Sequence, residues 1–319
     1  MRAFVASGAA RSRVGEALRP RAAALALWLG AGALLSGCTG EPAQPTEQAP
    51  PASQPSSSPI LHEITDPEGR IQGWLLGTIH ALPDGTLWRT GAIDRAIDKA
   101  DYLIVEIADP GSAAARAAFL ELSASAGLPP LAQRIAPPLR GELSELASAA
   151  GTSLAAFGST ETWAAALILA QAMRTGDPAN GVDRALIAQF SGRDIRELEG
   201  ARAQLRIFDS LAEEDQRALL ESVIGDFGDG IDQAGELRTA WLTGNAARIE
   251  AATRTGMLAD PELREAILIA RNRAWAARLD ALLARGEPPL IAVGAAHLVG
   301  PDGLPALLEA RGYTLRPQP

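Results

Sequence analysis

Two histidines stand at the same distance behind a glycine, one near the start of the chain and one near its end. Residues 77–80 read GTIH and residues 294–297 read GAAH, and each segment closes an apolar run typical of a buried strand. The chain has three histidines, so two of them share this GxxH pattern. Imidazole binds transition metals and transfers protons near neutral pH, which makes both segments candidate chemical sites.

A lone carboxylate interrupts a third apolar run, YLIVEI at residues 102–107. Burial of Glu106 without a partner is costly, so its carboxylate needs a cation, a hydrogen-bond donor or a metal. With His80 and His297 it would offer two nitrogens and one oxygen to a divalent transition metal, with positions left for water. Such a metal lowers the pKa of bound water and supports hydrolysis. The spacing fits equally well with histidines that only close their strands with backbone hydrogen bonds.

Short apolar strands must position these residues. We expect a β-hairpin over residues 60–80, because DPEG interrupts its two apolar segments as a turn signal. Further strands are expected at residues 102–107, 194–199, 289–297 and 313–317. Ligands of open α/β sheets bind at the C-terminal edge of the strands, where a glycine permits close backbone approach. We therefore expect both GxxH segments at that edge, with Gly77 clearing space beside His80.

Helical periodicity fills most of the remaining chain. We expect helices over residues 92–100, 113–124, 138–150, 161–174, 183–190, 213–224, 231–242, 261–284 and 304–310. Asp260 before Pro261 is a helix start signal, and Gly312 suits the C-terminal cap of the last helix. Residues 60–319 are therefore expected to form one α/β (α+β) domain with a small mixed central sheet and abundant covering helices.

The first 37 residues have the pattern of a signal peptide. Arginines precede the apolar run AAALALWLGAGALL, and LSGC follows it. LSGC resembles the lipobox of bacterial lipoproteins, in which the signal is cut before a cysteine that then receives lipid. Cys38 is the only cysteine, which excludes an intramolecular disulfide and a cysteine-based metal site. The alternative is an uncleaved signal anchor, for which the apolar run is short.

Residues 38–59 are rich in proline, serine and glutamine, which predicts a tether between membrane and domain. We expect a protein anchored through lipid on Cys38 at the periplasmic face of the bacterial envelope, in the outer membrane because Thr39 is not an aspartate. Loss of residues 1–37 removes five arginines and Glu16, which changes the net charge from −9 to −13. So acidic a body argues against nucleic acid as a partner.

Six stretches resemble, in this order, the TraB/PrgY/gumN family: WLLGTIHALPDG, ADYLIVEIAD, GVDRAL, RELEG, ARNRAW and VGAAHLVGPDGLPALLEARGY. This family shares a superfamily with the Tiki proteins and the erythromycin esterases, so the resemblance implies an erythromycin-esterase- and ChaN-like fold. The signature site residues of that superfamily are two GxxH histidines and an intervening glutamate, which match His80, His297 and Glu106 here. Tiki proteins are metal-dependent proteases, so the resemblance implies a divalent metal, Zn, Mn or Co, on these residues.

Three further candidates match family elements. Asp183 lies in a GxD element and could orient a histidine or bind metal, although the helix dipole also favours a carboxylate in a first turn. Glu199 follows Glu197 on the same strand face, and one of the two is a candidate general base. Arg271 lies in mid-helix and could stabilise an oxyanion or pair with a buried carboxylate. His62 lacks the second histidine of a zincin helix and is expected to be structural.

The leading interpretation is a lipid-anchored envelope hydrolase, metal-dependent and acting on the peptide bonds of an unidentified peptide or protein. The erythromycin-esterase branch implies another option, in which a histidine is the general base without a metal. The ChaN-like relatives imply a haem- or metal-binding lipoprotein without turnover, and the gumN relatives an accessory role in polysaccharide export. Serine catalysis has no support, because the chain has no GxSxG elbow.

Overall fold

The structure is a computed structural model that describes residues 58–318, except for the side chains of residues 228–233. The predicted signal peptide (residues 1–37), Cys38 and the predicted tether up to residue 57 lie outside the described residues. Between residues 58 and 318, no helix combines the length and the apolar character needed to cross a membrane.

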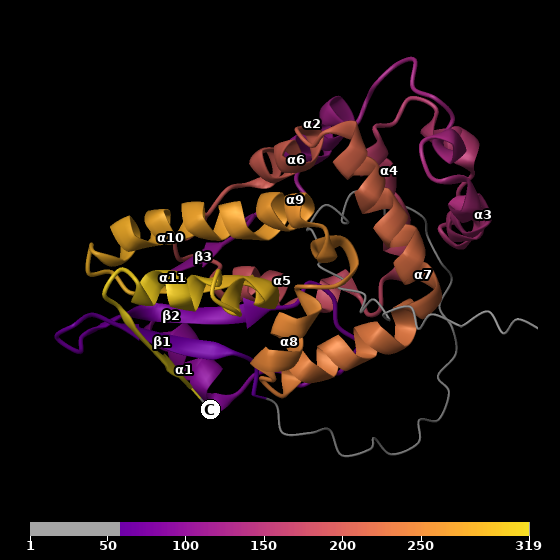
Figure 1. Cartoon of the computed structure of the whole chain (residues 1–319). Coiled ribbons are helices and arrows are strands. Elements are labelled where there is room, and N and C mark those ends of the chain that lie inside the picture. Colours follow the sequence, from indigo (N-terminus) through magenta and orange to yellow (C-terminus); the bar gives the residue numbers. More distant parts are fainter. Residues whose placement is uncertain (1–57, 319) are drawn as a thin grey trace, which may run out of the picture.

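The strands of the described chain form one mixed sheet (Figure 1). They are β1 (Leu61–Thr65), β2 (Ile71–Thr78), β3 (Tyr102–Val105), β4 (Ile195–Glu197), β5 (Pro289–Gly294) and β6 (Thr314–Pro317). Their order across the sheet is β4-β3-β5-β2-β1-β6. The first four in this order are parallel to one another, whereas β1 and β6 are antiparallel to their neighbours. The predicted fold class and the β1–β2 hairpin are both confirmed.

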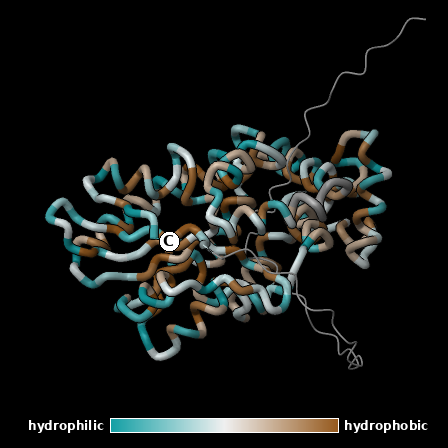
Figure 2. The backbone as a smooth tube through the Cα atoms, turned by 90° about the horizontal axis from the view of Figure 1, so that it is seen from below, coloured by the Kyte–Doolittle hydropathy of each residue, from teal (hydrophilic) through white to brown (hydrophobic). Residues whose placement is uncertain are grey.

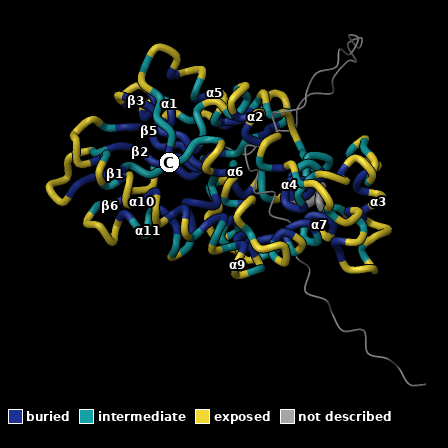
Figure 3. Tube along the Cα trace, turned by 90° about the horizontal axis from the view of Figure 1, so that it is seen from above, coloured by how far each residue is buried: buried dark blue, intermediate teal, exposed yellow. Residues whose placement is uncertain are grey.

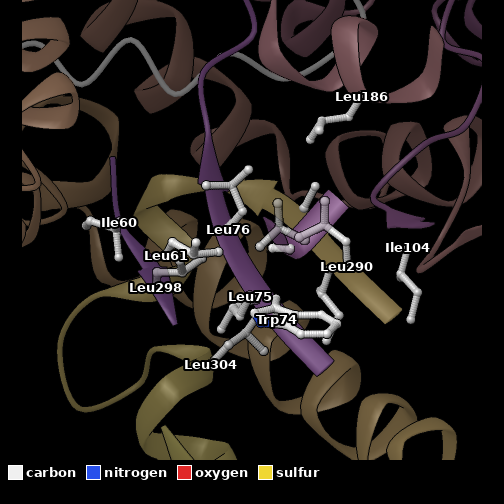
Figure 4. Packing of buried hydrophobic residues seen from close by; sticks show 14 of the residues in the cluster. Ile60, Leu61, Trp74, Leu75, Leu76, Ile104, Leu186, Leu290, Leu298 and Leu304 are labelled. Atoms are coloured by element: carbon white, nitrogen blue, oxygen red, sulfur yellow. The ribbon is translucent and has the colours of Figure 1, made fainter. Parts of the chain in front are cut away.

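The two GxxH strands, β2 and β5, are adjacent and central. Their register pairs Thr78 with Gly294, so both strands end at the same edge of the sheet. Leu75, Leu76 and Leu290 are fully buried, because helices cover both faces of the sheet here (Figure 4). Each such side chain stabilises the fold by roughly 1.5–3 kcal/mol through burial alone.

The described helices are α1 (Gly91–Lys99), α2 (Ala113–Leu122), α3 (Arg140–Ala149), α4 (Thr162–Ala170), α5 (Val182–Gln189), α6 (Ala201–Asp209), α7 (Glu213–Leu242), α8 (Ala246–Ala252), α9 (Pro261–Arg264), α10 (Ala270–Leu283) and α11 (Leu304–Glu309). Helices α1 and α5 cover one face of the sheet, and α10 and α11 cover the other (Figures 1 and 3). This arrangement follows from right-handed crossovers between the parallel strands. The crossovers from β2 to β3 and from β3 to β4 move across the sheet in one direction, and the crossover from β4 to β5 moves back in the other. Hydrophobic residues accordingly line the interior strands, and hydrophilic ones the outer loops (Figure 2).

A second hydrophobic core lies among the helices beyond the C-terminal edge of the parallel strands, where α2, α3, α4, α6 and α7 gather (Figure 1). Trp163 of α4 is its centre, with Phe119 at 5.8 Å edge-on and Phe208 at 6.1 Å stacked. The buried positions of α4 surround the helix on most sides, which suits a helix enclosed by other helices. The edge that carries the GxxH segments therefore faces protein as well as solvent.

Several helix boundaries differ from the prediction. The expected helices 213–224 and 231–242 are one continuous helix, α7, although glycines interrupt its sequence. Packing outweighs their low helix propensity, because Leu219 and Leu220 near one end and Trp241 near the other are buried. Helices α6 and α8 were not predicted, and the expected helix 261–284 contains a π-helical segment, Glu265–Ile269.

Candidate functional site

The C-terminal edge of the sheet collects one predicted site residue from each parallel strand. His80 lies two residues after β2, Glu106 directly after β3, and Glu199 two residues after β4. His297 lies in the 3₁₀ turn Ala295–Leu298 that follows β5. Parallel strands end together, so residues more than 200 positions apart in the sequence share one site.

The first GxxH histidine is paired with a carboxylate. Nδ1 of His80 lies 2.6 Å from Oδ2 of Asp183, and Thr78 donates its hydroxyl to Oδ1 of the same carboxylate at 2.8 Å. The side chains of His80 and Asp183 are 25% and 18% exposed. No described residue makes a hydrogen bond to Nε2 of His80, so this nitrogen is left for water or a ligand.

The backbone brings Asp183 to this place. The amide of Val182 donates to the carbonyl of Ile79 at 3.0 Å, which joins the start of α5 to the end of β2. A Cβ on Gly181 would collide with the carbonyl of His80, so only glycine permits this approach. The GVD sequence therefore places its carboxylate directly opposite the histidine.

The Asp183 carboxylate controls the charge of His80. Burial alone lowers the pKa of His80, but the negative charge of Asp183 and its hydrogen bond outweigh burial and raise the pKa to about 9. At neutral pH the imidazole is therefore protonated, and Nδ1–H is held by the carboxylate.

The second GxxH histidine has a neutral partner. His297 is 2% exposed, and its Nδ1 lies 2.5 Å from Oδ1 of Asn272. Its ring packs 4.5 Å from the ring of Trp275. Burial and the positive charge of Arg271 lower the pKa of His297 to about 3, so this imidazole is neutral at physiological pH.

Arg271 uses all five of its N–H donors inside the protein. Two go to Glu199 at 3.2 and 2.5 Å, and one goes to Glu106 at 2.7 Å. The other two, on Nη1, face the carbonyl of Ile267 at 3.0 Å and Nε2 of His297 at 3.4 Å. The side chain is 5% exposed, so a complete set of partners is what makes burial of this cation possible.

Glu106 is likewise fully engaged. Besides Arg271, it accepts hydrogen bonds from the amide of Gly294 at 2.8 Å and from Gln204 at 3.3 Å. Burial alone raises the pKa of Glu106, but the charge of Arg271 outweighs this and lowers it to about 2. For Glu199, by contrast, burial raises the pKa despite Arg271. Of the partners predicted for Glu106, a cation and hydrogen-bond donors are present, with Arg271 as the cation.

Gly77 matters for a different reason than predicted. A Cβ there would lie 3.2 Å from Cα and Cβ of Ala295 and 3.3 Å from Leu298, in the turn that carries His297. The carbonyl of Gly77 also accepts a hydrogen bond from the indole of Trp241 at 2.8 Å. The expectation that Gly77 clears space beside His80 was wrong, since it makes room for the turn that carries His297.

Comparison with known proteins decides the family. The family model described as TraB/PrgY/gumN matches residues 60–317, nearly all of the described chain. The chain belongs to this family. Neither the curated proteins nor the solved structures contain a significant match.

The metal that the TraB/PrgY/gumN resemblance implies does not fit this arrangement of side chains. Arg271 holds an oxygen of Glu106 and faces Nε2 of His297, so two of the three expected ligands point at a cation. Among the side chains described for residues 58–227 and 234–318, no group of three or more His, Cys, Asp or Glu lies close enough to hold a metal ion. The metal ligand set His80, Glu106 and His297, which the resemblance implied, stays a prediction.

Other residues that the sequence singled out also lie at this site. Asp183 orients His80, one of the two roles considered for it, and Arg271 pairs with buried carboxylates. His62 lies in β1, where it is paired in register with Leu75 of β2 and Pro317 of β6. Gln204 was missed, and Asn272, which matches the family's Arg-Asn pair together with Arg271, had no predicted role although it holds Nδ1 of His297.

Proposed function

We propose that this TraB/PrgY/gumN protein is a lipid-anchored envelope hydrolase that cleaves acyl bonds, with peptide bonds as its substrate class. The observation that supports it most is the His80–Asp183 pair. Its Nε2 has no hydrogen-bond partner among the described residues, whereas Glu106, Arg271 and His297 are buried and bound to one another. An imidazole fixed at Nδ1 by a carboxylate, with Nε2 left for water or a substrate, is the arrangement of a proton-transfer group.

In the proposed reaction His80 is the general base. Its neutral form takes a proton from water at Nε2 while the water oxygen attacks the carbonyl carbon. The imidazolium then gives that proton to the leaving amine as the acyl bond breaks. Asp183 holds Nδ1–H throughout and stabilises the imidazolium. No step is assigned to a metal.

The pKa of His80 gives this proposal a pH dependence. With a pKa of about 9 the base form is a small fraction at pH 7. For a base-dependent reaction kcat/KM should rise roughly tenfold per pH unit from 7 and level off near pH 9.

The test uses the purified full-length chain and a panel of fluorogenic peptides and esters. His80→Ala should lower kcat/KM for the cleaved substrates by roughly 10²–10⁴-fold. His62→Ala, on a strand outside the site, is the matched control and should leave the rate unchanged. Equal rates for His80→Ala and the unaltered chain, or a rate that falls between pH 7 and 9, would exclude His80 as the base.

A chelation arm separates the two forms of the proposal. The metal-dependent form requires that EDTA abolish activity and that Zn, Mn or Co restore it, whereas the metal-free form requires that EDTA have no effect.

Anchoring is tested separately, by labelling cells with radioactive palmitate. Label should enter the unaltered protein and be absent from Cys38→Ser, and label in both would contradict lipidation of Cys38.

A further inference from the structure

We propose that His297 is a positioning residue, a neutral imidazole whose Nε2 accepts the fifth N–H of Arg271 and so holds that guanidinium on its two carboxylates. The inference deepens the proposed function, since it assigns a role to the second GxxH histidine of the same site. It also gives that histidine a task other than binding metal or moving protons.

The hydrogen bonds of Asn272 fix the tautomer of His297. Asn272 donates Nδ2–H to the carbonyl of Asp302 at 2.8 Å, and a carbonyl can only accept. The amide oxygen of Asn272 must therefore face His297, and it lies 2.5 Å from Nδ1. An oxygen acceptor at that distance requires the proton on Nδ1. The lone pair of the neutral ring is then on Nε2.

That lone pair faces a group that can only donate. Nη1 of Arg271 lies 3.4 Å from Nε2 of His297, and guanidinium has no acceptor. A proton on Nε2 would point an N–H at an N–H and place two cations together. Without His297, the fifth donor of a side chain that is 5% exposed would have no partner among the described residues.

Two aromatic contacts fix the same geometry. The indole of Trp275 lies 4.5 Å from the ring of His297, and the guanidinium carbon of Arg271 lies 4.5 Å above the Trp275 ring. Both groups therefore pack on one indole, which holds them next to each other. At 2% exposure, His297 has no path to a substrate, so its effect reaches the reaction through Arg271.

The experiment is ¹⁵N NMR of the full-length chain labelled on histidine, which works here because the chain has three histidines. Long-range ¹H–¹⁵N correlations distinguish the Nδ1–H tautomer, the Nε2–H tautomer and the imidazolium. His62→Gln and His80→Gln assign two of the signals by their loss. The third belongs to His297, so no altered His297 has to fold.

The expected spectrum at neutral pH shows His297 as a neutral Nδ1–H tautomer, and addition of Zn²⁺ leaves its Nε2 signal in place. Three outcomes would overturn the proposal: an Nε2–H tautomer, an imidazolium, or a zinc-dependent shift of that Nε2. None of these readings depends on hydrolysis, so failure of the proposed reaction and failure of this role are distinguishable.

A pair of substitutions adds a second measurement. His297→Gln keeps an acceptor that can reach Arg271, whereas His297→Leu leaves one buried N–H without a partner. In urea unfolding, the leucine variant should have a folding equilibrium constant at least about tenfold below that of the glutamine variant. A leucine variant as stable as the glutamine variant would contradict the role of acceptor.

Discussion

The two GxxH segments carry the same motif and hold their histidines in opposite states. His80 is partly exposed, paired with a carboxylate and protonated at neutral pH, whereas His297 is buried, paired with an amide and neutral. In both, Nδ1 faces an oxygen that comes from a helix. The carboxylate of Asp183 raises the pKa of His80, whereas His297 has only an amide partner and is subject to deeper burial and the charge of Arg271, which lower its pKa.

The largest expected effect concerns the buried side of this comparison. Arg271→Leu removes the cation that Glu106 and Glu199 share, and the free energy of unfolding should fall by about 3–5 kcal/mol, measured by urea denaturation. Arg273→Leu is the control in the same helix, since its ion pair with Glu265 is exposed and should contribute less than about 1 kcal/mol. Similar losses in the two variants would show that the buried network contributes no more than a surface pair.

The two histidines should make the free energy of unfolding change with pH in opposite directions. The pKa of His80 is raised to about 9, so its stabilisation is present below about pH 6.5 and is lost as the pH rises through 9. The pKa of His297 is lowered to about 3, so its contribution is present above pH 6.5 and is lost as the pH falls. Between pH 4.5 and 9.5 each limb amounts to about 3 kcal/mol, at about 1.4 kcal/mol per pKa unit.

Urea denaturation between pH 4.5 and 9.5 measures both limbs, in a range where Glu106 stays ionised. His80→Gln should flatten the alkaline limb and His297→Gln the acidic one. Stability curves of the same shape for both variants and the unaltered chain would contradict the assigned charge states.

An exchange of the two partners tests their role directly. Asp183→Asn should lower the pKa of His80 by at least about one unit, and Asn272→Asp should raise that of His297 by a similar amount, because each histidine gains the other's kind of partner. Histidine ¹⁵N titration measures both, with the signal of His62 as internal control. Unchanged pKa values would mean that the partners do not set the charge.

The smallest expected effect compares the two motif glycines. Gly77→Ala should cost about 1 kcal/mol of unfolding free energy, because its Cβ would press on Ala295 and Leu298. In Gly294→Ala the Cβ would meet Glu106 at 3.4 Å, close to ordinary contact, and the loss should be below about 0.5 kcal/mol. A larger loss at Gly294, measured in urea, would reverse this ranking.

Sequence patterns predicted the sheet well because its strands are short, apolar and bounded by turn signals. Hydrophobic runs located β2, β3 and β5, and the GxxH spacing placed His80 and His297 at one edge. The order of the strands could not be predicted in this way, because no local pattern specifies that β5 lies between β2 and β3. The rule of right-handed crossovers assigns helices to the faces of the sheet only after that order is known.

The helices and the inner contacts of the site were harder to predict. The two expected helices of α7 fuse because tertiary packing overrides the glycines, which no local propensity reveals. The sequence showed that Glu106 needs a cation, a hydrogen-bond donor or a metal, but that Arg271 is this partner depends on how α10 lies across the sheet. The hydrogen bond of Asn272 to His297 likewise exists only in three dimensions.

The π-helical segment Glu265–Ile269 ties chain length to the chemistry of the site. A π-helical turn holds one residue more than the α-helical turn it replaces, and each residue of an α-helix turns the axis by about 100°. Loss of one residue there would make α9 and α10 a regular helix and shift their relative phase by that angle. Either Arg271 would leave its carboxylates or α9 would leave its core, so in this stretch the number of residues is constrained as strictly as their identity.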